Sequence, residues 1–187
     1  MRPAPLPLAA LCALVLAGCG NTLQEGPISH SSLEGLIVNP FPIYWLGGSF
    51  KGLELKETSH DPSGGFSVLY GDCLEGGQGT CVPPLRVVTS ADNSFFPGGQ
   101  THTRATRIRG VPALLAQSGT TIIIPTGPVV VDIFALNRTL AAEAARTIVP
   151  INEPGTPEGP LPASLPDTGY GSTPLASQEP PPLRPVR

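Results

Sequence analysis

Two runs of β-branched residues joined by a short link constrain the fold of this 187-residue chain more than any other feature. The first run covers residues 120–124, the second covers 129–134, and residues 125–128 between them contain Pro, Thr and Gly. Val and Ile favour strands, and a short glycine-containing link between two such runs is typical of a β-hairpin. Because both runs are almost continuously apolar, we expect central or doubly covered strands.

The segment after the hairpin has the pattern of an amphipathic helix. Asn137 is a favoured N-cap residue, and Leu140, Ala144 and Ile148 recur at intervals of four residues. Pro150 cannot continue a helix. We therefore expect one helix that begins after Asn137 and packs its apolar side on the sheet.

Shorter strand signals precede the hairpin. Aromatic, β-branched or alternating runs bounded by Gly and Pro predict strands near residues 43–46, 53–57, 66–70, 85–89 and 101–109. The apolar piece at 111–115 has no decisive pattern. The sequence predicts the α+β class, as a small twisted antiparallel sheet of about six to seven strands with one C-terminal helix packed on a face.

The composition changes at both ends of the predicted domain. Pro and Gly together account for 46 of the 187 residues, and the prolines are concentrated after Asn152. We predict a flexible tether over 19–35, a single α+β domain over 36–152 and a disordered Pro-rich tail over 153–187. Deleting the tail should leave the thermal midpoint almost unchanged.

The first 18 residues have the parts of an export signal. Arg2 is basic, and residues 6–17 are apolar apart from Pro7, too short a run to span a bilayer that needs roughly 20 residues. Small residues precede Cys19, and the stretch 16–19, Leu-Ala-Gly-Cys, resembles the lipobox of bacterial lipoproteins. An ordinary secretory signal that is cleaved nearby is the alternative.

The lipobox resemblance implies cleavage before Cys19, diacylglycerol on its sulfur and fatty acyl chains such as palmitate. It places the protein at the cell membrane, facing the extracytoplasmic side. Two acyl chains give stable anchoring where one is marginal. From residues 109–113 through the hairpin to 144–146, the body is loosely similar to uncharacterised exported actinobacterial lipoproteins, and this implies no activity.

The lipobox interpretation assigns different roles to the four cysteines. Cys12 leaves with the signal and Cys19 carries lipid, so Cys73 and Cys81 remain in an oxidising compartment, where we expect a disulfide. Closing this short loop is worth roughly 2–3 kcal/mol. A redox or metal pair is the alternative, but the spacing fits neither CxxC chemistry nor a short zinc knuckle.

The charge excludes one class of partner. The formal net charge is −3, and removing the signal takes away only Arg2. Nucleic-acid binding usually needs a concentrated basic patch, so we expect no nucleic-acid partner. The expected partners are the membrane, through lipid on Cys19, and a cell-wall polymer or another envelope protein.

Three histidines are candidate metal ligands or catalytic bases. His30 lies in the predicted tether, His60 precedes Asp61 in a turn, and His102 lies between threonines on a predicted strand. A zinc site from His60, Asp61 and His102 lacks any recognised ligand spacing. We therefore predict no metal, no cofactor and no catalytic residue.

The glycine-rich stretch and the carboxylates near the cysteines each allow two interpretations. The stretch 76–79 is glycine-rich, but no Lys or helix start follows, so a flexible loop is favoured over a phosphate-binding loop. Asp72 and Glu75 either bind a cation weakly or are exposed turn carboxylates.

Three arginines and two aromatic residues complete the candidates. Arg104 should point away from Arg107 and Arg109 on a regular strand. Two roles are open for these arginines. They contact lipid headgroups or an acidic polymer, or they are solvated charges that protect a sheet edge from aggregation. Tyr44 and Trp45 line a ligand groove or pack in the core.

The sequence favours a lipid-anchored envelope protein that is a non-catalytic binding or structural module. The alternative is an envelope hydrolase or a lipid-binding carrier. That alternative requires a deep apolar cavity between sheet and helix, or His60, Asp61 and His102 within bonding distance.

Overall fold

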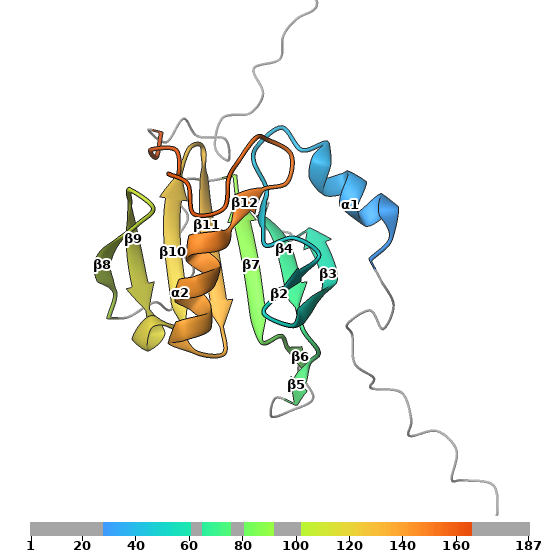
Figure 1. Cartoon of the computed structure of the whole chain (residues 1–187), viewed down its shortest axis with the longest axis horizontal. Helices are drawn as coiled ribbons and strands as arrows, with labels where there is room; N and C mark the ends of the chain where they lie inside the picture. The colour runs from blue at the N-terminus through green and yellow to red at the C-terminus, as the bar shows by residue number, and fades with distance from the viewer. Residues whose placement is uncertain (1–27, 61–64, 76–80, 92–101, 166–187) are drawn as a thin grey trace, which may run out of the picture.

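An antiparallel sheet lies at the centre of the protein (Figure 1). The computed structural model describes residues 28–60, 65–75, 81–91 and 102–165. Within these ranges the main sheet has eight strands, in the order β2-β3-β4-β7-β11-β10-β9-β8. Their bounds are β2 Ser49–Phe50, β3 Leu53–His60, β4 Gly65–Tyr70, β7 Leu85–Ser90, β8 Arg104–Ile108, β9 Val111–Ala116, β10 Thr121–Thr126 and β11 Val129–Ala135.

The predicted hairpin is confirmed as the middle of this sheet. β10 and β11 pair antiparallel, and the Thr126↔Val129 pair leaves Gly127 and Pro128 as a two-residue turn. Gly127 has a φ of 51°, the positive value that the first position of such a turn favours. β7 flanks β11 and β9 flanks β10, so the undetermined piece at 111–115 belongs to a strand.

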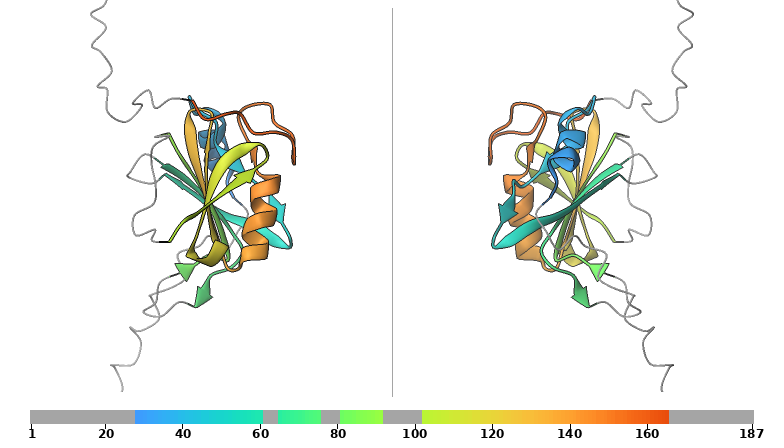
Figure 2. Two further views of the ribbon diagram at one scale, coloured as in Figure 1. Left: turned by 90° about the vertical axis from the view of Figure 1, so that its left-hand side faces the viewer. Right: turned by 90° about the vertical axis from the view of Figure 1, so that its right-hand side faces the viewer.

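The predicted C-terminal helix is α2, Arg138–Thr147. The side chain of Asn137 accepts a hydrogen bond of 2.9 Å from the backbone N–H of Leu140, which is the expected N-cap. Ala141, Ala144 and Ala145 are fully buried against the sheet. Figure 2 shows α2 lying along one face of the sheet, which we call the helix-side face.

A second layer completes the helix-side face. β1, Tyr44–Trp45, pairs with β12, Val149–Pro150, as a two-stranded ribbon. The backbone N–H of Tyr44 donates to Thr89 Oγ1 on β7 at 3.0 Å, so the ribbon lies over that strand. The main core fills the space beneath these elements, and its fully buried members include Tyr70, Leu85, Val87, Ile122, Ile124 and Ile133.

The alternate residues of the same strands form the opposite face. In one row across β4, β7, β11 and β10, the strand register aligns Ser67, Val88, Asp132 and Ile123. All four are buried, but none belongs to the main core cluster. The opposite face thus combines apolar side chains with polar and charged ones.

The predicted α+β class is confirmed, with one more helix than expected and one to two more strands in the main sheet. The additional helix is α1, His30–Ile37, within the stretch predicted as a tether. The side chain of Ser29 accepts from the N–H of Ser32 as its N-cap, and Leu36 is buried in the core. Neither α1 nor α2, the α-helices of the described ranges, is long and apolar enough to cross a bilayer.

The described chain also continues beyond residue 152. Arg109 donates to the backbone oxygens of Ile148, Thr156 and Gly159, and Leu161 is buried against the core. One guanidinium has five N–H donors, so it can bind several carbonyls of one segment at once. Backbone hydrogen bonds from Glu158 to Arg146 and from Leu161 to Arg109 add to this attachment. Residues 153–165 therefore follow the surface of the domain, while 1–27 and 166–187 lie outside the described residues.

Two short elements remain. β5, Leu74–Glu75, and β6, Cys81–Val82, form a separate two-stranded ribbon. The 3-10 turn η2, Gln117–Gly119, connects β9 to β10.

Candidate functional site

The structure separates the histidines that a metal site would need. His60 ends β3 and His102 lies just before β8, and five strands lie between β3 and β8 in the sheet order. At about 4.8 Å per strand, the two strands are roughly 25–30 Å apart. These two residues therefore cannot share a metal ion, and Asp61 lies outside the described residues. No group of three possible metal ligands occurs within the described ranges.

His30 and His60 both have surface positions near α1. His30 is the exposed first residue of that helix. The His60 ring lies edge-on to Phe66, with centroids 4.7 Å apart. A cavity of about 160 Å³ lies here, lined by Ser31, Ser32, Gly35, Leu36, Thr58, Ser59, His60 and Phe66.

Tyr44 and Trp45 pack rather than line a groove. Tyr44 is buried, and this burial raises the pKa of its hydroxyl while a hydrogen bond with Thr126 opposes the rise. Trp45 is half-buried against the core. Tyr70 has a similar role: its hydroxyl accepts from the N–H of Leu46 at 2.8 Å and donates to the Gly47 carbonyl at 3.1 Å. Burial raises the pKa of Tyr70 as well.

The three clustered arginines have three different environments. Arg107 donates to the Gly110 carbonyl at 2.7 Å, and Arg109 holds the segment after β12. Burial lowers the pKa of Arg109. Arg104 extends to the helix-side face, where its register partner is Leu115. Strand alternation thus separates Arg104 from Arg107, as predicted. The prediction is wrong for Arg109, which follows the end of β8 with a positive φ and donates to Ile148 on the helix side instead of sharing the side of Arg107.

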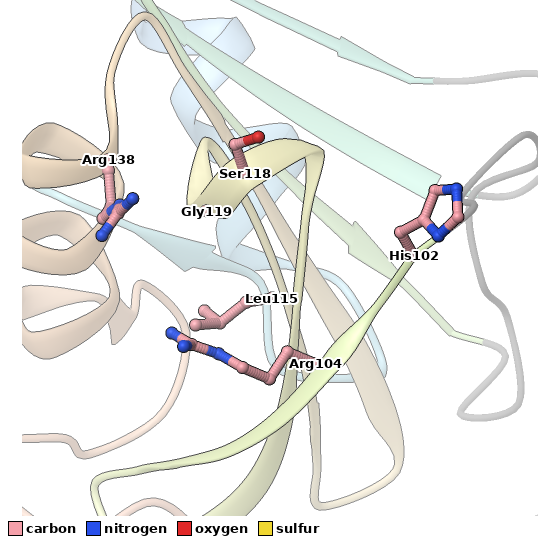
Figure 3. A pocket seen from close by; sticks show the side chains of 6 residues that line it. All are labelled: His102, Arg104, Leu115, Ser118, Gly119 and Arg138. Atoms are coloured by element: carbon pink, nitrogen blue, oxygen red, sulfur yellow. The ribbon is translucent and has the colours of Figure 1, made fainter.

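Arg104 lines a cavity of about 240 Å³ at the edge of the helix-side face (Figure 3). The residues that line this cavity come from β9, η2, the first turn of α2 and the beginning of β8: His102, Arg104, Leu115, Ser118, Gly119 and Arg138. We call it the basic cavity, because three of the six are basic and none is acidic. In Figure 3 the guanidinium end of Arg104 lies near Leu115, that of Arg138 lies farther from Leu115 beside α2, and the His102 ring points away from both.

The backbone of η2 explains how Arg138 reaches the cavity. Gln117, Ser118 and Gly119 have consecutive positive φ values of 48°, 59° and 90°. A Cβ placed on Gly119 would lie 3.0 Å from Cγ of Arg138 and 3.4 Å from its Cδ. The aliphatic part of Arg138 therefore packs directly on Gly119. Glycine suits this position because it adopts the positive φ readily and has no Cβ to crowd the Arg138 side chain.

Asp132 is an unusual group on the opposite face. It is 1% exposed at the centre of β11, and neither carboxylate oxygen has a hydrogen-bond partner within the described residues. Burial raises the pKa of this carboxyl to about 7, and the positive charge of Arg86 opposes the rise. Such a carboxyl can gain or lose a proton near neutral pH.

Arg86 is itself anchored beside Asp132. It donates to Ser67 Oγ through Nη2 at 2.7 Å and through Nε at 3.1 Å. Its Cζ lies 5.9 Å from the centroid of the Phe134 ring. Neither Asp132 nor Arg86 is among the candidates predicted from the sequence. One signal was present: Asp132 is the only charged residue in the apolar run 129–134.

The remaining predicted candidates lie around β5 and β6. Asp72 pairs with Lys56 at 2.9 Å and is exposed, which fits a surface carboxylate. Glu75 opposes Cys81 in the register of the ribbon, and Cys73 directly precedes β5. The side chains of Glu75 and Cys81, the loop 76–79 and Cys19 lie outside the described residues.

No protein-family model, characterised protein or solved structure matches this chain. The basic cavity is therefore the candidate site on the grounds of its own residues and geometry.

Proposed function

We propose that this protein is a lipid-anchored, non-catalytic binding module of the cell envelope. The observation that carries the proposal is the Leu-Ala-Gly-Cys stretch at 16–19, directly after a short apolar run and before the domain. Lipid on Cys19 would hold the domain at the extracytoplasmic surface of the cell membrane. Another envelope protein or a cell-wall polymer would then be within its reach.

The exposed basic cavity supports a binding role for the domain. Its arginines are held by regular elements, Arg104 on β8 and Arg138 on α2, rather than by long loops. Rigid strands and helices position binding groups more accurately than loops do.

The hydrolase and carrier alternatives have less support. The interface between α2 and the sheet is filled by Ala141, Ala144 and Ala145, each 0% exposed. His60 and His102 belong to opposite parts of the sheet. Neither the apolar cavity nor the histidine cluster that those activities require is found in the described part of the chain.

Membrane fractionation and intact mass measurement test the anchor. The mature protein should start at Cys19, carry the mass of diacylglycerol or a further acyl chain, and sediment with membranes. Cys19→Ala should lose the acyl mass, and the matched variant Cys12→Ala should keep it. An unmodified thiol on Cys19, or an N-terminus elsewhere, would contradict the proposal.

We further propose that Cys73 and Cys81 form a disulfide in the exported protein. The β5–β6 pairing supports this, because Cys73 directly precedes β5 and Cys81 is the first residue of β6, the strand that pairs with it. Alkylation before and after reduction should show two thiols that only reduction exposes. Reduction should lower the free energy of unfolding by roughly 2–3 kcal/mol. Two thiols that react without reductant would refute the pairing.

A further inference from the structure

We infer that the basic cavity binds a phosphoryl group, either in a lipid headgroup or as a soluble phosphate. The inference names the ligand class of the proposed binding module and rests on that proposed function. Its physical basis is the meeting of unneutralised positive charges in a small cavity.

The first observation concerns the partners of the two arginines. Within the described residues, neither Arg104 nor Arg138 has an ion pair or a side-chain hydrogen bond. Arg107 and Arg109, in contrast, donate to backbone carbonyls. Two guanidinium groups that line one cavity repel each other, and an anion between them would convert this repulsion into attraction.

The second observation concerns the start of α2. Helices favour acidic side chains in the first turn, because the N-terminal end of a helix has a partial positive charge. The first turn of α2 has no acidic residue, and Arg138 is its first residue. Asn137 satisfies the N–H of Leu140 but adds no charge. The helix end therefore adds to the positive potential of the cavity instead of opposing it.

The third observation concerns size and shape. The cavity volume is about 240 Å³. Most sites for drug-sized ligands are larger, at roughly 300–1,000 Å³. Leu115 gives the cavity one apolar wall, and Ser118 gives it a hydroxyl group. A tetrahedral oxyanion suits this arrangement, because each planar guanidinium can bind two of its oxygens at once.

The chain as a whole has a net charge of −3, so general attraction of anions does not explain the site. Any binding must come from the local arrangement of Arg104 and Arg138. That requirement separates the inference from a non-specific charge effect.

The test uses the full-length protein purified in a neutral detergent. Inorganic phosphate is titrated at constant ionic strength, with binding followed by calorimetry and by amide NMR shifts near Ser118 and Gly119. We expect saturable binding that Arg104→Gln and Arg138→Gln each weaken by about tenfold. The matched variant Arg107→Gln, on the same strand, should retain the wild-type affinity.

A second titration distinguishes the two sources of the phosphoryl group. Short-chain phosphatidic acid is added to the same micelles, with short-chain phosphatidylcholine as its control. Binding that is tighter for phosphatidic acid than for inorganic phosphate, and that depends on Arg104, assigns a lipid headgroup. Equal or weaker binding assigns a soluble phosphate.

The inference is overturned if neither phosphate source binds saturably, or if Arg107→Gln weakens binding as much as Arg104→Gln. Arg104 is exposed on the terminal strand β8, so its substitution should leave the thermal midpoint unchanged. The titrations and the acyl mass on Cys19 are independent measurements. Failed titrations with the acyl mass present overturn only this inference, whereas a missing acyl mass overturns the proposed anchor.

Discussion

The two faces of the central sheet are built from alternate residues of the same strands but differ in chemistry. Beneath α2, β11 contributes Val129, Val131 and Ile133, all fully buried in the main core. On the opposite face the same strand contributes Val130 and Asp132, which are also buried. One strand thus supports an apolar core on one side and an unpartnered carboxyl on the other.

The two faces contribute oppositely to the free energy of folding: the helix-side face stabilises the domain, and the buried carboxyl on the opposite face destabilises it. The helix-side face buries apolar groups, which favours folding by roughly 25 cal/mol per Å². The opposite face buries a carboxyl without a hydrogen bond, which costs free energy whenever that carboxyl is charged. The predictions below test this contrast.

The largest effect is expected on the helix-side face. Ile133→Ala removes a fully buried side chain and should lower the free energy of unfolding by about 2–5 kcal/mol. Leu136→Ala, just beyond the same strand, is the control, because Leu136 is 60% exposed and its loss should change little. Chemical denaturation measures both. Similar small effects for the two variants would show that this face is not the core.

The pH dependence of stability tests the opposite face. The pKa of Asp132 rises from its ordinary value of 3.8 to about 7, so the folded state binds more protons than the unfolded state between these values. The contribution of Asp132 to stability should therefore be fully present below about pH 4 and be lost as the pH rises towards 7, by on the order of 4 kcal/mol at most. Arg86 on β7 and Glu57 on β3 are charged groups of the same face.

Asp132→Asn removes this titration. The variant should be more stable than the wild type at pH 8 and should lose the fall between pH 4 and 7. Asp72→Asn is the control, because Asp72 is exposed and its substitution should keep the wild-type slope. Parallel profiles for wild type and Asp132→Asn would disprove the buried, neutral carboxyl.

Two truncations test how far the helix-side face extends. Removing 166–187 should leave the thermal midpoint unchanged, because Leu161 and the acceptors of Arg109 remain. Removing 153–187 should cost about 2 kcal/mol, because the core loses Leu161 and Arg109 loses carbonyl partners. This revises the expectation from sequence that the whole tail is dispensable. Equal midpoints for the two truncations would restore that expectation.

The smallest effect concerns the electrostatics of the opposite face. Arg86→Gln removes the charge that lowers the pKa of Asp132, so that pKa should rise further above its ordinary value. Carboxyl ¹³C NMR across a pH titration measures the shift. Arg107→Gln serves as the comparison, and a fall in the Asp132 pKa in Arg86→Gln would contradict the assignment.

Local patterns predicted much of the fold. The β-branched runs identified the hairpin, and Asn137 identified the start of α2, because turn and capping preferences act within a few residues. The number of strands was underestimated, since 111–115 is too short and mixed to distinguish strand from coil. Helix α1 was missed because its serine-rich, glycine-containing sequence resembles a linker, and its burial of Leu36 depends on distant residues.

The candidate site was only partly predictable. Arg104 was singled out, and its separation from Arg107 followed from strand alternation, whereas the position of Arg109 did not, because Arg109 lies in the turn after β8. Arg138 was not, because a single arginine at a helix start carries no pattern of its own. Asp132 had a local signal, a carboxyl within an apolar run, but its lack of a hydrogen-bond partner depends on the strands beside it.

The sequence by itself determined the hairpin, the final helix and the proposed lipid anchor at Cys19, because each depends on neighbouring residues. Only the tertiary structure decided that Arg104 and Arg138 line one cavity and that Asp132 is buried with no hydrogen-bond partner among the described residues. The physical reason is the same for both. Charge–charge interactions and desolvation depend on distances in space, and strand pairing and helix packing set those distances between residues far apart in the chain.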